Sequence, residues 1–78
     1  MTDTNRKAAQ SLIHTSAADC QITALNAAES RPADFLRLAA DTFDYLDEQR
    51  MGRKSHRKAL AQAARHAIKK LSETQHNG

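Results

Sequence analysis

The side chains in this 78-residue chain that could perform chemistry are one cysteine, four histidines and several closely spaced acids. Cys20 would be a nucleophile if a histidine lay beside it, because the thiolate is the reactive form. It sits instead on an alanine-rich helical face, where a small apolar side chain packs well. No nucleophile, base and orienting group fall within reach of one another, so we expect no enzymatic activity.

The histidines are too widely spaced for a metal site on one helix. Helical metal sites usually place their ligands three or four residues apart. His56, His66 and His76 are ten residues apart and do not return to the same helical face, and His14 lies far away in the sequence. The sequence therefore predicts neither a metal site nor a cofactor.

Three acids, Asp41, Asp44 and Glu48, are spaced three and four residues apart and so form one stripe on a helix. Such a stripe could act as paired carboxylates or as a divalent-ion site. No glycine-rich loop or Glu-x-x-His motif accompanies it, so a solvated face is the commoner meaning. A sharper hypothesis is an acidic surface for a basic protein partner or for the chain's own basic segment.

Positive charge is concentrated in one stretch near the C-terminus. Between Gln49 and Leu71 there are eight lysines and arginines and no acid, within a chain of net charge +3. Cations at this density are typical of a surface that contacts phosphates. We therefore expect a non-enzymatic regulatory or accessory protein that binds nucleic acid with little sequence specificity. The expected binding residues are Arg53, Lys54, Arg57, Lys58, Arg65, Lys69 and Lys70.

The same stretch does not fit a standard helix-turn-helix. That motif needs a small residue about four positions before the turn glycine and a large apolar one about six after it. Around Gly52 these places hold Glu48 and Lys58. We expect contacts to the nucleic-acid backbone instead. Because the three aromatic residues all fall between residues 32 and 50, single strands have little to stack on.

A second hypothesis is a protein-binding adaptor or inhibitor. Its partner would contact the alanine-rich face of the first helix or the acidic stripe. The residues of this alternative surface are Ile13, Ala17, Ala24, Asp41, Asp44 and Glu48.

Helical periodicity predicts the elements that carry these residues. Three helices are expected, over about 6–28, 32–50 and 55–72, in a small all-α three-helix bundle or helical-hairpin assembly. A break of the first helix at Thr15-Ser16 is the alternative to one long helix. Pro32 suits a first helical turn, Gly52 suits a helix stop, and Ser55 is a natural N-cap.

The apolar residues are numerous but small. The chain holds fifteen alanines against seven leucines, three isoleucines and two phenylalanines, and it has no valine or tryptophan. A core of this kind buries little area per residue, at about 25 cal/mol per Å². We therefore expect homodimerisation to complete it. The second helix, with most of the bulky residues, is expected at the centre, and Ile68 on the inner face of the third.

The remaining expectations concern the ends of the chain and its location. Residues 1–5 are expected to fray, 6–72 to form a single domain, and 73–78 to be a disordered tail. A single cysteine and the lack of a signal-like or membrane-length apolar run favour a cytoplasmic protein that does not enter membranes.

Overall fold

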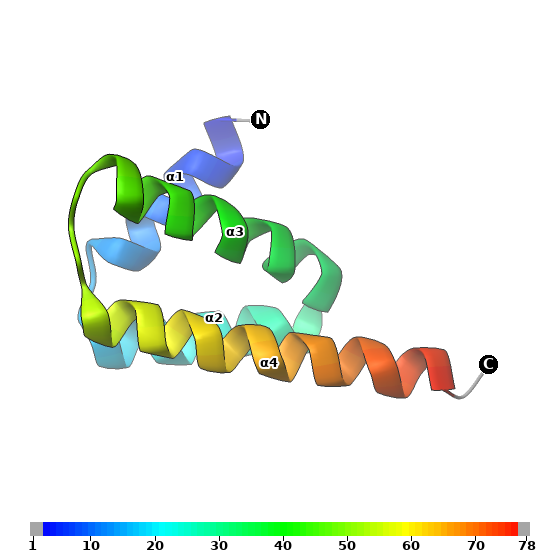
Figure 1. Cartoon of the computed structure of the whole chain (residues 1–78). Helices are drawn as coiled ribbons and strands as arrows, with labels where there is room; N and C mark the ends of the chain where they lie inside the picture. Colours follow the sequence, from blue (N-terminus) through cyan, green and yellow to red (C-terminus); the bar gives the residue numbers. More distant parts are fainter. Residues whose placement is uncertain (1–2, 77–78) are drawn as a thin grey trace.

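The computed structural model describes residues 3–76, with side chains for residues 6–73. This part of the chain folds into helices and contains no strand, which confirms the expected all-α class (Figure 1). The helices are α1 (Asp3–Ile13), α2 (Ala17–Ser30), α3 (Pro32–Glu48) and α4 (Lys54–His76).

The first predicted helix is broken in two, so the long helix over 6–28 is wrong and the alternative break at Thr15-Ser16 is correct. Ser16 takes an extended backbone, and its hydroxyl accepts a hydrogen bond from the Asp19 N–H at 3.1 Å. This is N-cap geometry, which satisfies a backbone donor that a continuous helix would have used internally. The Thr15 hydroxyl donates to the Asp19 carboxylate at 3.4 Å and holds the same corner.

One residue separates α2 from α3. The Arg31 N–H donates to the Ala27 carbonyl at 2.8 Å, while the Arg31 carbonyl accepts from the Phe35 N–H at 2.8 Å. Arg31 thus closes one helix and opens the next, and Pro32 follows in the first turn as predicted. Because proline has no N–H, its position in the first turn adds no unpaired donor at this change of direction.

The α3–α4 connection stops α3 with an arginine and not with the predicted Gly52. Arg50 has a φ of 53°, in the left-handed region. The Met51 N–H donates to the Leu46 carbonyl at 3.0 Å, and the Arg50 N–H donates to the Asp47 carbonyl at 3.2 Å. These two bonds form a Schellman motif, whose left-handed position is usually glycine.

The start of α4 also differs from the prediction. The helix begins at Lys54, and the Arg57 N–H donates to the Arg53 carbonyl at 2.9 Å. Ser55 therefore lies inside the first turn and is not the N-cap.

The ends of the described chain also differ from the prediction. Helix α4 runs to His76, so residues 73–76 are helical where a disordered tail was expected. At the N-terminus, α1 starts at Asp3, inside the segment expected to fray. Residues 1–2 and 77–78 lie outside the described part.

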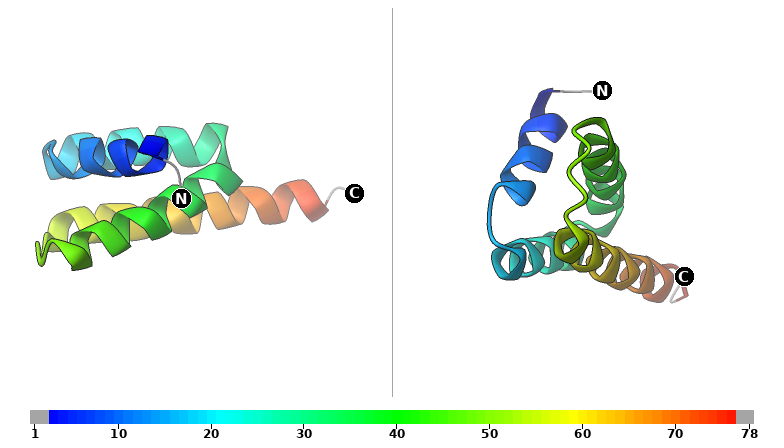
Figure 2. Two further views of the ribbon diagram at one scale, coloured as in Figure 1. Left: turned by 90° about the horizontal axis from the view of Figure 1, so that it is seen from above. Right: turned by 60° about the vertical axis from the view of Figure 1, so that its left-hand side comes forward.

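The helices pack around one small core. The most extensive interface joins α2 and α4, which run parallel, and α1 and α3 lie side by side over this pair (Figures 1 and 2). Phe35 and Leu46 of α3 are buried, as expected for the helix with the bulkiest residues. The remaining buried apolar side chains are Ala9, Leu12, Ile13, Cys20, Ala24, Ala28, Ala39, Tyr45, Ala59, Leu60, Ala63 and Ala67.

The chain thus buries a core of its own, and the expected helical bundle is confirmed with four helices in place of three. Homodimerisation remains a prediction. The C-terminal turns of α4 project past the ends of α2 and α3 (Figure 1). Ile68, expected on the inner face, is 56% exposed, because its helical position lies about 120° from the centre of the buried face, on a surface shared with Arg65 and Lys69.

We expect Arg50→Gly to stabilise the fold. A non-glycine residue in the left-handed region costs roughly 1–2 kcal/mol, and glycine adopts it freely. The free energy of unfolding in urea should rise by about 1 kcal/mol. Gln49→Gly is the control, because Gln49 is right-handed at φ −84° and should lose stability. A destabilised Arg50→Gly variant would contradict the assignment of strain to this residue.

Candidate nucleic-acid interface

Helix α4 separates an apolar inner face from a basic outer face. Its inner face buries His56, Ala59, Leu60, Ala63 and Ala67. At 3.6 residues per turn, the opposite side carries four cations within an arc of about 60°, over a length of about 22 Å. We call this set the basic stripe; it consists of Lys54, Lys58, Arg65 and Lys69, and all four are exposed.

The other cations of the predicted binding set differ in their surroundings. Arg57 lies on the flank of α4 that faces α3, where its guanidinium contacts the Asp47 carboxylate at 2.7 Å. Lys70 lies on the flank that faces α2 and contacts the Glu29 carboxylate at 2.6 Å. Arg53 precedes the helix and is exposed. Within residues 6–73, no ion pair involves Arg53 or any member of the basic stripe.

A small charged cluster holds the C-terminal end of α2 against α4. The Glu29 carboxylate receives the Lys70 ammonium at 2.6 Å and the His66 ring nitrogen Nε2 at 3.3 Å. The hydrogen bond from Lys70, followed by that from His66, lowers the pKa of Glu29 below its ordinary value of 4.5. The same bond raises the pKa of Lys70. Both groups are exposed to solvent, so the cluster directs the packing more than it holds the fold together.

The acidic stripe of α3 does not face α4. Its helical positions point toward solvent and toward α1, where Glu48 contacts the Arg6 guanidinium at 3.2 Å. Asp44 is exposed and Asp41 is half-buried. The hypothesis that this stripe complements the basic helix is therefore wrong. Within residues 6–73, α4 forms ion pairs with Asp47 of α3 and Glu29 of α2, and the basic stripe is exposed.

The apolar residues proposed for the alternative protein-binding surface, on α1 and α2, are mostly enclosed. Ile13 and Ala24 have no exposed surface, because they pack inside the chain's own core. Ala17 is half-buried at the start of α2. A partner could reach the first two only if the bundle opened.

His56 has a role that the sequence analysis missed. It is 6% exposed, and its Nε2 donates to the Thr15 carbonyl at 2.7 Å. The bond ties the first turn of α4 to the corner between α1 and α2. A signal was present in the sequence, since His56 shares the buried face with Leu60, Ala63 and Ala67 at helical spacing.

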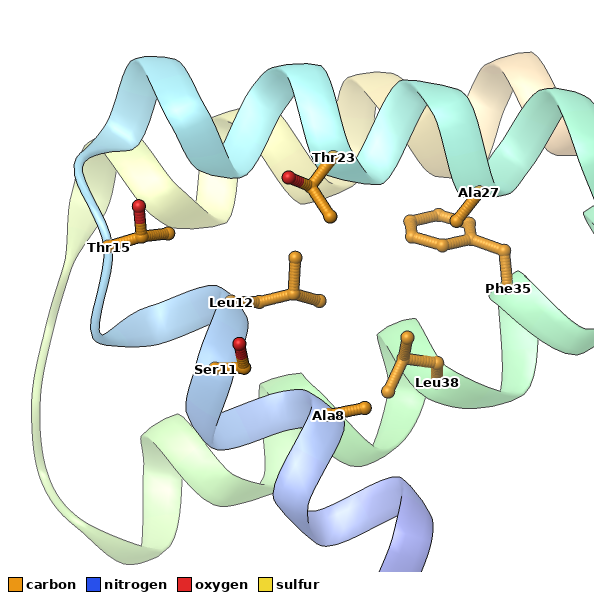
Figure 3. A pocket seen from close by; sticks show the side chains of 8 residues that line it. All are labelled: Ala8, Ser11, Leu12, Thr15, Thr23, Ala27, Phe35 and Leu38. Carbon is orange, nitrogen blue, oxygen red and sulfur yellow. The ribbon is translucent and has the colours of Figure 1, made fainter.

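A separate cavity of about 280 Å³ opens between α1, α2 and α3 (Figure 3). Leu12, Phe35 and Leu38 converge on it, and hydroxyls of Thr15, Thr23 and Ser11 lie around them. Since no titratable residue lines this cavity, its lining offers no acid or base to activate these hydroxyls. Among the described residues there is also no cluster of three or more histidines, cysteines and acids placed to hold a metal ion.

In the part of the chain that the structure covers, no helix combines the length and apolar character needed to cross a membrane.

No protein-family model matches the chain, and neither does any curated protein or solved structure.

We expect Cys20 to react slowly with thiol reagents in the folded protein. The side chain is fully buried, and this burial raises the pKa of the thiol, so little thiolate is present at neutral pH. Alkylation by iodoacetamide, followed by mass spectrometry, should be complete in denaturant and at least about 100-fold slower in buffer. Equal rates in the two conditions would contradict the buried position.

The Glu29 cluster should give a pH-dependent stability. Because the folded-state pKa of Glu29 is lowered, its contribution is present above its ordinary value of 4.5 and is lost as the pH falls through the folded value. Glu29→Gln should therefore lower the midpoint of urea unfolding at pH 7 and have little effect at pH 3. Asp44→Gln is a control on α3, outside the cluster. Equal losses at both pH values would point to packing in place of charge.

Proposed function

We propose that this protein binds double-stranded nucleic acid through the basic stripe of α4, with little dependence on base sequence. The observation that supports the proposal is the sorting of cations on this helix. Arg57 and Lys70, on the flanks, are neutralised within the chain. Lys54, Lys58, Arg65 and Lys69 line the outer face, and none of them forms an ion pair within residues 6–73.

Four cations held on a rigid helix suit a regular row of phosphates. A helix that is already folded pays little ordering entropy on binding, and each neutralised phosphate releases condensed counterions. All four side chains are exposed, so this row is accessible to a ligand. Affinity of this kind is strong at low salt and weak at high salt.

A duplex fits better than a single strand. Recognition of unpaired bases depends on exposed aromatic rings on which the bases stack. Phe35 and Tyr45 are buried, and Phe43 is half-buried against the core. The outer face of α4 carries charge without rings, which supports contact with a phosphate backbone.

Homodimerisation belongs to the same proposal. Ile68 is 56% exposed beside the basic stripe, and Leu71 on the same projecting segment is half-buried. Association of two copies through this segment would cover apolar surface that a single chain leaves in water. Light scattering at low and high salt tests this part independently of nucleic acid.

We expect the double variant Arg65→Ala/Lys69→Ala to bind a short random-sequence duplex more weakly and with a smaller salt dependence. Removing two phosphate contacts should reduce the slope of log K against log salt by about 2. Fluorescence anisotropy from about 50 to 200 mM salt measures both quantities.

The matched control for this prediction is Lys7→Ala/Arg37→Ala, which removes the same charge from exposed positions on α1 and α3. This variant should retain most of the affinity and nearly all of the salt slope. If both double variants lose affinity equally, net charge and not the basic stripe controls binding. If the wild-type protein does not bind the duplex at all, the proposed function is wrong.

A further inference from the structure

A cleft of about 430 Å³ separates the first turns of α2 and α4. Both helices begin at this end of the bundle and run parallel from it (Figure 2). The volume lies within the range of roughly 300–1,000 Å³ that is usual for ligand-binding clefts. The residues that line it are Ala17, Ala18 and Gln21 from α2 and Ser55, Lys58, Ala59 and Gln62 from α4.

The lining is suited to an anion. Its one charged group is the Lys58 ammonium, which belongs to the basic stripe, and Ser55 adds a hydroxyl donor. No carboxylate is present among the lining residues. Asp19, the acid in this turn of α2, does not line the cleft. Its carboxylate accepts a hydrogen bond from the Thr15 hydroxyl, and its backbone N–H donates to the Ser16 hydroxyl oxygen.

A hydrogen bond across the cleft orients its amide groups. Gln21 Nε2 donates to Gln62 Oε1 at 2.9 Å. Because the Gln62 oxygen is occupied in this way, its amide N–H groups are the part that can serve a bound molecule. The two glutamines therefore add donors to the lysine and the hydroxyl, and the bond fixes their orientation before any ligand arrives.

The three alanines give the cleft a floor of small side chains. A bound group can approach the helix backbones closely there, because no larger side chain stands between them. The first-turn N–H groups of Ala17, Ala18 and Ser55 have no acceptor within their own helices, and they add a positive potential from two parallel helices. This contribution supports the side-chain donors.

We infer that this cleft binds one phosphate group of the nucleic-acid backbone and so sets the position of α4 along the duplex. The inference rests on the proposed function. The phosphate is held by Lys58, Ser55 and the Gln62 amide, while Arg65 and Lys69 follow the backbone further along the helix. Contacts to phosphate from lysine, serine and glutamine position a protein without reading bases.

The test is Ala18→Glu, which places a carboxylate at the cleft. Ala18 is an exposed first-turn position, where an acid favours the helix dipole, so the variant should fold. Ala33→Glu is the matched control: it is also an exposed alanine in the second position of a helix, α3, and it adds the same charge away from the cleft. In duplex anisotropy, Ala18→Glu should weaken binding about tenfold, because like charges in contact oppose association. Ala33→Glu should change it less than about twofold.

Circular dichroism and thermal unfolding establish that both variants are folded. Equal affinities of the two glutamate variants for the duplex would overturn the assignment of the cleft as a phosphate site. The proposed function would still stand if Arg65→Ala/Lys69→Ala lost binding. Absence of duplex binding in every protein, the wild type included, would overturn the proposed function.

Inorganic phosphate separates the backbone from a free phosphate as the source of the ligand. In ¹H–¹⁵N spectra, phosphate should shift the amide signals of Ala17, Ala18 and Ser55 more than sodium chloride of equal ionic strength does. Shifts without duplex binding would mean a site for free phosphate and would overturn the backbone assignment. Identical shifts with phosphate and chloride would overturn the phosphate site itself.

Discussion

The structure depends on the close parallel packing of α2 against α4. Each helix contributes small side chains to the shared core, Ala24 and Ala28 from α2 and Ala63 and Ala67 from α4. Small residues let two helix backbones approach, although each buries little area. Because one side of α4 is committed to this interface and to α3, the opposite side must face water. The lysines and arginines that share that opposite side by sequence spacing are thereby presented together.

Charge is sorted by the same packing. Acids on the elements beside α4 neutralise the cations on its flanks, through Asp47 on α3 and Glu29 on α2. The acidic stripe of α3 turns toward α1 and solvent, where Glu48 meets Arg6. The Arg6 guanidinium also lies over the Tyr45 ring, 5.7 Å from the ring centre, and this cation–π contact helps to hold Arg6 in position. The net charge of +3 therefore understates the local field along α4.

Much of the fold could be predicted from the sequence, because helix formers and apolar spacing agree over most of its length. The helical class, the first turn at Pro32 and the burial of bulky residues of the second predicted helix followed from these patterns. The end of α3 did not, since a left-handed Arg50 is an exception to the glycine rule and local propensity cannot reveal it. Ile68 lies at one edge of the apolar stripe of α4, and which edge the neighbouring helices cover is a property of the assembled bundle.

The candidate site shows the same division. The basic stripe follows from helical spacing alone, so its residues could be listed from the sequence. Which cations are neutralised depends on contacts between residues far apart, such as Lys70 and Glu29, and no local pattern encodes them. The cleft at the start of α2 and α4 is likewise invisible in either segment by itself, because it exists only when the two helices lie in parallel.

The bond from His56 to the Thr15 carbonyl joins positions 41 residues apart. The corner between α1 and α2 is therefore completed by a side chain from the last helix of the chain. During synthesis, α1, α2 and α3 emerge before this partner is available, and contacts that close long loops form late. The corner between α1 and α2 therefore lacks this hydrogen bond until α4 has packed against it.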